Sequence, residues 1–152
     1  MTTVSDGTKL IFSGLAGFYE RARDVAYTLV RVIIGYILFM HGWAKVTGPG
    51  LSGITSYMSK QGLEPAIVFA SSAMFLETVG AACIIVGLFT RFFAAALAIE
   101  LGIAFVTVHW AKGFSAAQGG FEYVLLLGVV MFAIALRGGG PYSIDRVIGK
   151  EL

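Results

Sequence analysis

Residues 65–88 read PAIVFASSAMFLETVGAACIIVGL and residues 92–110 read FFAAALAIELGIAFVTVHW, and these two stretches decide the fold class. Each is long enough to cross the hydrocarbon core of a bilayer as a helix, which takes about 20 residues. Each holds a single Asp, Glu, Lys or Arg: Glu77 in the first and Glu100 in the second. The link between them is so short that it predicts an antiparallel pair of membrane helices.

Two further stretches of similar length complete the pattern. Residues 25–43 contain one charged residue, Arg31, and residues 119–136 contain one, Glu122. The sequence therefore predicts an all-α membrane protein, an antiparallel bundle of four transmembrane helices with spans at about 25–43, 65–88, 92–110 and 119–136.

The remaining segments are expected to lie outside the bilayer core. Residues 1–24 predict a cytoplasmic or interfacial segment without a cleavable signal peptide, because acidic residues interrupt its apolar part. Short interfacial helices are expected within residues 10–19 and 51–63. Residues 148–152 predict a cytoplasmic tail, which leaves residues 25–147 as the membrane domain.

The composition supports lipid contact and argues against other classes. Of the residues, 57% are hydrophobic and 13% charged, with a mean hydropathy of +0.83, whereas a soluble domain carries about 25% charged residues. The basic residues are scattered and form no stripe, so nucleic acid is not an expected partner. The single cysteine, Cys83, allows neither an internal disulfide nor a CxxC redox pair. We therefore expect no soluble-type catalysis.

Basic residues predict the orientation. Three of them fall on one side of the predicted spans: Lys45, Lys60 and Lys112. Seven fall on the side that holds both termini: Lys9, Arg21, Arg23, Arg91, Arg137, Arg146 and Lys150. Cytoplasmic loops carry the excess of Lys and Arg. Both termini are therefore expected in the cytoplasm.

Three ionisable residues are predicted at similar depth inside the bilayer: Arg31, Glu77 and Glu100. A charged side chain at a helix centre costs about 2.5–3.5 kcal/mol on insertion scales, so such residues normally pair or serve a function. We predict that Arg31 pairs with Glu77, Glu100 or both. The cluster is either a structural clamp that fixes helix register or a site for protons or a ligand.

A second set of polar residues is expected at the outer ends of the spans, as a candidate ligand or proton site. Its members could bind a quinone carbonyl or pass protons, or they could simply meet lipid headgroups. Two distant histidines and one glutamate do not predict a metal site. The set consists of His41, Lys45, His109, Glu122 and Tyr123.

Several short motifs, in their order and spacing, resemble the DoxX family of small bacterial membrane proteins over about residues 25–147. They are Arg31-Val-Ile-Ile-Gly35, His41-Gly42-Trp-Ala-Lys45, Glu77-Thr-Val-Gly80, Gly87-Leu-Phe-Thr-Arg91, His109, Lys112-Gly113-Phe114, Glu122-Tyr123 and Gly140-Pro141-Tyr142-Ser143-Ile144-Asp145. The positions of this chain that match the motif residues of the family are Arg31, His41, Gly42, Lys45, Glu77, Gly80, Arg91, His109, Glu122 and Asp145.

The resemblance implies a multi-pass protein of the bacterial cytoplasmic (inner) membrane that accompanies oxidoreductase systems. Relatives include the membrane subunit of thiosulfate:quinone oxidoreductase and partners in thiol oxidation and superoxide defence. The chain has no cysteine pair and no fused soluble domain, so catalysis is expected to belong to a protein partner. The expected function is an accessory or quinone-facing subunit, with a quinone as the candidate cofactor. A small proton-coupled carrier and a structural envelope-stress assembly factor are the alternatives, and a homo-oligomer stays open.

Overall fold

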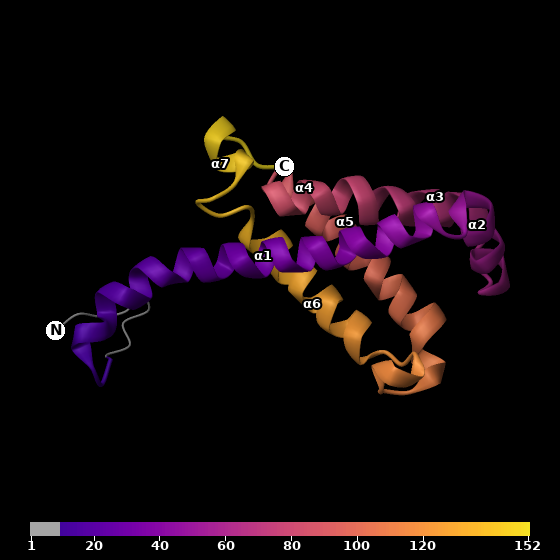
Figure 1. The fold of residues 1–152 in the computed structure, drawn as a ribbon, viewed down its shortest axis with the longest axis horizontal. Coiled ribbons are helices and arrows are strands. Elements are labelled where there is room, and N and C mark those ends of the chain that lie inside the picture. Colours follow the sequence, from indigo (N-terminus) through magenta and orange to yellow (C-terminus); the bar gives the residue numbers. More distant parts are fainter. Residues whose placement is uncertain (1–9) are drawn as a thin grey trace.

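The computed structural model describes residues 10–152, which are helical and contain no strand (Figure 1). The N-terminal part of the predicted segment 1–24, residues 1–9, lies outside the described residues, and so does Lys9 of the charge count. The helices are α1 (Ala16–Thr47), α2 (Gly50–Lys60), α3 (Ala66–Phe75), α4 (Ala81–Val86), α5 (Thr90–Ala104), α6 (Glu122–Arg137) and α7 (Ile144–Ile148).

Two π-helical segments interrupt the regular helices. The segment η2 (Leu76–Gly80) joins α3 to α4, and η3 (Phe105–His109) continues α5 into the 3-10 turn η4 (Trp110–Lys112). Insertions of this kind are rare and often lie at functional sites. Here they carry Glu77 and His109.

In the described part of the chain, three helical stretches are long and apolar enough to cross a membrane: Ser13–Thr47, Ala66–Val86 and Thr90–Lys112. The helix α6 is apolar but shorter, with 16 residues. The predictions of an all-α chain and of a membrane protein are confirmed at this level.

The first helix begins before the predicted span of residues 25–43. Residues 10–19 do not form a separate helix, because α1 runs without a break from Ala16 to Thr47 after the short 3-10 turn Ser13–Leu15. No proline or glycine lies between Phe18 and Ile34 to end it. Figure 1 shows the N-terminal part of α1 extending beyond the other helices. The predicted short helix within residues 51–63 is present as α2.

Glycines set the close approach of α1 to the α3–α4 segment. A Cβ added at Gly42 would lie 2.5 Å from the carbonyl carbon of Glu77, and one at Gly35 would lie 2.9 Å from the Ile85 side chain. Small residues at such crossings let membrane helices pack backbone to backbone. On the other side of the molecule, α5 packs along α6. The buried side chains between the helices include Leu38, Ile84, Leu97, Leu127 and Met131.

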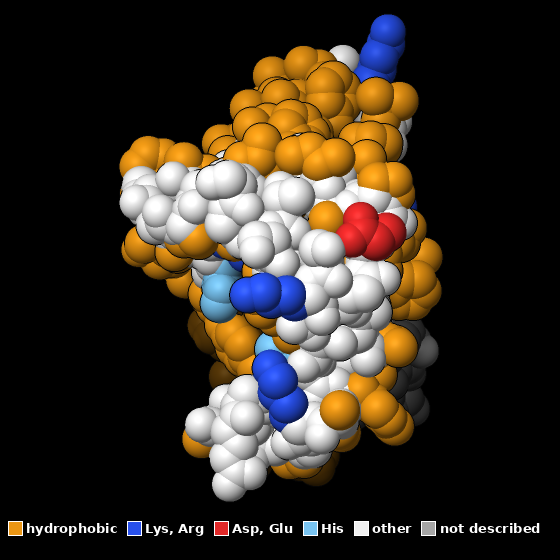
Figure 2. All heavy atoms as spheres, turned by 90° about the vertical axis from the view of Figure 1, so that its right-hand side faces the viewer, with side chains coloured by type: hydrophobic (Ala, Val, Ile, Leu, Met, Phe, Trp, Pro, Cys, Tyr) orange, Lys and Arg blue, Asp and Glu red, His pale blue; other side chains and the backbone are white. Residues whose placement is uncertain are grey.

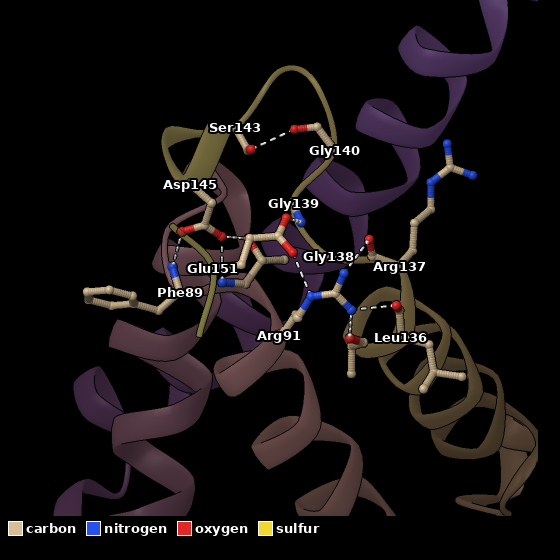
Figure 3. A network of polar contacts seen from close by, with 12 residues as sticks. Phe89, Arg91, Leu136, Arg137, Gly138, Gly139, Gly140, Ser143, Asp145 and Glu151 are labelled. Atoms are coloured by element: carbon tan, nitrogen blue, oxygen red, sulfur yellow. Dashed lines mark hydrogen bonds and ion pairs between the residues drawn. The ribbon is translucent and has the colours of Figure 1, made fainter. Parts of the chain in front are cut away.

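The C-terminal segment, residues 138–152, folds back onto the turn between α4 and α5 (Figures 1 and 3). Asp145 accepts hydrogen bonds from Phe89 N at 2.7 Å, Thr90 N at 2.9 Å and Thr90 Oγ1 at 2.7 Å. This carboxylate satisfies amides at the start of α5, where the helix dipole favours a negative charge. Arg91 extends the network to Glu151 and to the carbonyls that end α6.

Candidate functional site

Arg31 does not join the predicted charge cluster. It is 1% exposed, and its guanidinium donates to the carbonyls of Ile84 at 2.5 Å, Ile85 at 2.8 Å and Tyr142 at 2.7 Å. The helix α4 ends at Val86, so the carbonyls of its last turn have no partner within the helix. Arg31 satisfies two of them. The predicted pairing with Glu77 or Glu100 is therefore wrong.

Lys45 is the cation that pairs with Glu77. The Lys45 ammonium donates to Glu77 Oε1 across the α1–η2 contact, and Glu77 is 7% exposed. Gly42 lies one helical turn before Lys45 and brings the two backbones together. The pair thus links one residue from each of the two sets that the sequence suggested.

Glu100 approaches this pair from α5. Its carboxyl group lies within hydrogen-bonding reach of the Glu77 carboxyl. Both Glu77 Oε2 and Glu100 Oε2 are buried, and neither accepts a hydrogen bond from a donor in the described part of the chain. Lys45 forms its ion pair with Glu77, and Glu100 lines the same cavity.

One cavity is lined by residues of both sets, without Arg31 and Glu122. Its volume is about 670 Å³, and α1, α2, α3, α5, α6 and the π-helical segments η2 and η3 contribute to its walls. Most lining side chains are apolar. The ionisable side chains that line it are His41, Lys45, Tyr57, Glu77, Glu100, His109 and Tyr123. The two midplane carboxyls and four of the five outer residues thus line one cavity.

Figure 2 views the molecule from the side on which α2 lies in Figure 1. Lys or Arg and His side chains lie near the middle of this face, and hydrophobic side chains border them.

His109 has a defined orientation. Its Nδ1 lies 2.7 Å from the carbonyl oxygen of Gly119, and because a carbonyl only accepts, Nδ1 carries the hydrogen. In neutral imidazole, Nε2 is then the accepting nitrogen. The rings of His41 and Tyr123 lie 6.3 Å apart between their centroids. The cavity therefore holds a proton acceptor, an ammonium group and a phenol hydroxyl.

Glu122 is a member of the predicted outer set that does not line the cavity. Its Oε1 accepts a hydrogen bond from Ala116 N at 2.6 Å, so it closes the turn that precedes α6. Sequence position put Glu122 beside Tyr123, but neighbouring residues of a helix face different directions. Within residues 10–152, no group of three His, Cys, Asp or Glu side chains could hold a metal ion.

Sequence reasoning missed the part that α2 plays in the site. Ile54, Tyr57 and Met58 of α2, together with Leu63, line the cavity. The spacing of these apolar residues predicted a helix with one apolar face, and that face covers the cavity. The spacing alone could not show what it covers, because an amphipathic helix meets lipid and protein with the same pattern.

The fold and the site define a helical membrane protein with a mainly apolar internal cavity that holds a charged pair. The chain belongs to the DoxX family: the DoxX family model matches residues 26–110. This confirms the resemblance found in the motifs.

Relatives support the assignment over nearly the whole chain. CatD of Bacillus subtilis, a candidate oxidoreductase by its name, is 30% identical over 131 residues, which are 86% of this chain and 92% of CatD. The inner membrane protein YqjF of Escherichia coli is 27% identical over 135 residues, 87% of this chain and 98% of YqjF. An uncharacterized protein of Haemophilus influenzae is 30% identical over 136 residues, 87% of this chain and 97% of that protein. No solved structure matches the chain.

Proposed function

We propose that the chain crosses the bacterial inner membrane four times, as an antiparallel bundle with both termini in the cytoplasm. α6 would be the fourth crossing: it packs along α5, and its 16 residues span about 24 Å at about 1.5 Å per residue. A span slightly shorter than the bilayer core is accommodated by local thinning. The name of YqjF supports the inner membrane. Reporter fusions after Lys60 and Lys112 should read outside and one after Lys150 inside; an outside signal at Lys150 would contradict this topology.

We propose further that the cavity binds the headgroup of a lipid-soluble quinone, and that the protein serves as an accessory membrane subunit of an oxidoreductase. The observation that carries this proposal is the cavity itself, with apolar walls and a few convergent polar groups. Its volume, about 670 Å³, lies within the range of small-molecule sites, about 300–1,000 Å³. The name of CatD supports a link to oxidoreductases.

The polar groups suit a ring with two carbonyl oxygens. Lys45 uses one N–H on Glu77, so two remain for a ligand. The Tyr123 hydroxyl can donate to a carbonyl, and His109 Nε2 can accept from a hydroxyl of the reduced ring. A bound quinone would supply electron and proton transfer, and these side chains would orient its ring and hold its protons.

Two lining residues suggest how a lipid-soluble ligand would enter. Val68 on α3 is 54% exposed and Ile99 on α5 is 66% exposed, and both also line the cavity. In a bilayer these apolar side chains would face lipid. An isoprenoid tail could therefore leave the cavity between α3 and α5 while the headgroup stays near Lys45.

Quinone binding can be measured directly on purified protein. A short-chain quinone should bind the wild type, and His109→Ala should weaken binding about tenfold, because one lost hydrogen bond is worth about 1.4 kcal/mol. Glu122→Gln is the matched control, since it lies on the same side of the bundle but outside the cavity. Unchanged affinity in a His41→Ala, His109→Ala double variant that is still folded would refute quinone binding at this site.

The two carboxyl groups favour a second candidate, a small proton-coupled carrier. Buried ionisable residues of this kind mark proton and ion pathways in membrane proteins. Flux of a substrate driven by a pH gradient in liposomes, lost in Glu100→Gln, would favour the carrier over the oxidoreductase subunit.

A further inference from the structure

Glu77 and Glu100 present a charge imbalance that the proposed quinone site does not use. Glu77 is buried, and its Oε1 takes the single ammonium of Lys45. Within residues 10–152, no donor binds its other oxygen, Oε2, or Glu100 Oε2, although both residues line the cavity. If both carboxyls were ionised, the cluster would carry one uncompensated negative charge in mainly apolar surroundings.

The contact between the two carboxyls indicates how this charge is removed. Ionised carboxylates only accept hydrogen bonds, so two of them within hydrogen-bonding reach repel each other. One added proton turns the repulsion into an O–H···O bond and satisfies both oxygens. Carboxyl pairs that share a single proton for this reason are well established in enzymes.

We propose that Glu77 and Glu100 form a proton-binding site on the cavity wall, in which one proton is shared between Glu77 Oε2 and Glu100 Oε2 while Lys45 balances the remaining carboxylate. The step is a simple protonation equilibrium, with no change in oxidation state. A metal cation fits this site less well, because it needs several oxygen ligands at once, and in the part of the chain that the structure describes no group of three His, Cys, Asp or Glu side chains could hold one.

Other titratable groups face the same cavity from each element around it. They are His41 and Lys45 on α1, Tyr57 on α2, His109 on η3 and Tyr123 on α6. Only Lys45 carries a fixed positive charge, and it already contacts Glu77. The two histidines line the cavity together with the carboxyl pair, so they are the groups through which the proton would exchange with a ligand or with the outer surface.

Infrared spectroscopy of the purified protein tests the site without any quinone. A protonated carboxyl has a carbonyl stretching band that a carboxylate lacks, and the band shifts in D₂O. At neutral pH the wild type should show this band, and Glu100→Gln should lose it. The side-chain amide that this substitution introduces can still donate to Glu77 Oε2, so the variant should fold.

Glu64→Gln is the matched control. Hydrogen bonds from the Ser59 hydroxyl and the Ala66 amide lower the pKa of Glu64, which is exposed and ionised at neutral pH. This variant should keep the band. Absence of the band in the wild type, or its persistence in Glu100→Gln, would overturn the proposal.

Stability against pH gives a second, independent readout. The folded pair holds one proton that separated carboxyls release at neutral pH, so the native state binds more protons than the unfolded state and stability falls as pH rises. The unfolding equilibrium constant should rise by up to about tenfold per pH unit, and Glu100→Gln should remove this slope. Equal slopes in the two proteins would contradict the site. Neither measurement depends on quinone binding, so the two proposals can fail separately.

Discussion

The buried charged side chains at the two ends of the helix assembly differ in how completely they are hydrogen-bonded. At the end held by the C-terminal segment, Asp145 and Arg31 are each 1% exposed; Asp145 accepts three hydrogen bonds and Arg31 donates three, with only Arg31 Nε left over. At the cavity end, Glu77 and Glu100 each keep one buried oxygen that no donor of the described chain reaches. Nearly complete hydrogen bonding fixes one arrangement, whereas open acceptors leave room for a proton or a ligand. On our proposal, the first end is structural and the second binds the ligand and the proton.

The largest expected effect is at the structural end. Asp145→Ala removes three hydrogen bonds from the first amides of α5 and from Thr90 Oγ1. Bonds to a charged group are worth about 1.5–3 kcal/mol each and are not additive, so we expect a loss of at least ~3 kcal/mol. Thermal unfolding in detergent measures it. Asp24→Ala on α1 is the control, because the Asp24 side chain is 46% exposed and lies 3.9 Å from Arg137 in a surface ion pair. Equal melting of the two variants would show that the Asp145 hydrogen bonds do not stabilise the fold.

Arg31→Met should have the next largest effect, a loss of about 2–3 kcal/mol of folding stability. It removes the donor from the carbonyls of Ile85 and Tyr142 and leaves the Ile84 carbonyl with the longer 3.3 Å bond from Gly87 N, while methionine keeps part of the apolar contact. Short-chain quinone affinity in the folded fraction should stay at the wild-type value, which would support a purely structural role for Arg31. Weaker quinone binding with unchanged melting would reverse the roles assigned to the two ends.

Gly42→Ala should lower folding stability by about 1–3 kcal/mol, as overpacking of a well-packed contact typically does. The new Cβ would meet the carbonyl carbon of Glu77 at 2.5 Å, so α1 must move away from η2 and the Lys45–Glu77 pair must lengthen. We expect lower stability together with weaker quinone binding. Gly17→Ala, on the open part of α1, is the control because nothing lies near its added Cβ. A stable variant with normal binding would mean that the close approach is unnecessary.

Glu122→Gln should have the smallest effect on folding stability, a loss below about 1 kcal/mol. A neutral amide oxygen can still accept the hydrogen bond from Ala116 N. Since Glu122 does not line the cavity, quinone affinity should not change. A clear loss of affinity in this variant would restore Glu122 to the site and contradict its structural role in the turn.

The fold class was predictable because hydrophobic length depends only on the local sequence. Runs such as residues 65–88 have to be membrane helices whatever they pack against. The partner of Arg31 was not predictable in this way. Depth in the bilayer placed Arg31 near Glu77 and Glu100, but depth does not fix which way a side chain points, and main-chain carbonyls leave no mark in a sequence. The signal that could have helped is Gly87, whose left-handed conformation (φ 74°) ends α4 and frees the carbonyls that Arg31 binds.

The candidate site was predictable in its residue types and only partly in its grouping. His41, Lys45, His109 and Tyr123 do line one cavity, but Glu77 and Glu100 line it too, although they had been assigned to a separate midplane cluster. The link is the Lys45 side chain, whose length lets an outer residue reach a deeper carboxyl. The cover formed by α2 could not be predicted, since its apolar face would also suit the membrane surface.

Mapping where a quinone binds tests the central claim most directly. A photoreactive quinone can be cross-linked to the protein in liposomes, with and without an excess of unmodified quinone, and the labelled residues identified by mass spectrometry. The account predicts competable labelling of the cavity lining between Leu38 and Leu127, with most label near His109 and Tyr123. Labelling confined to the C-terminal segment, residues 138–152, or labelling that unmodified quinone does not reduce, would contradict it.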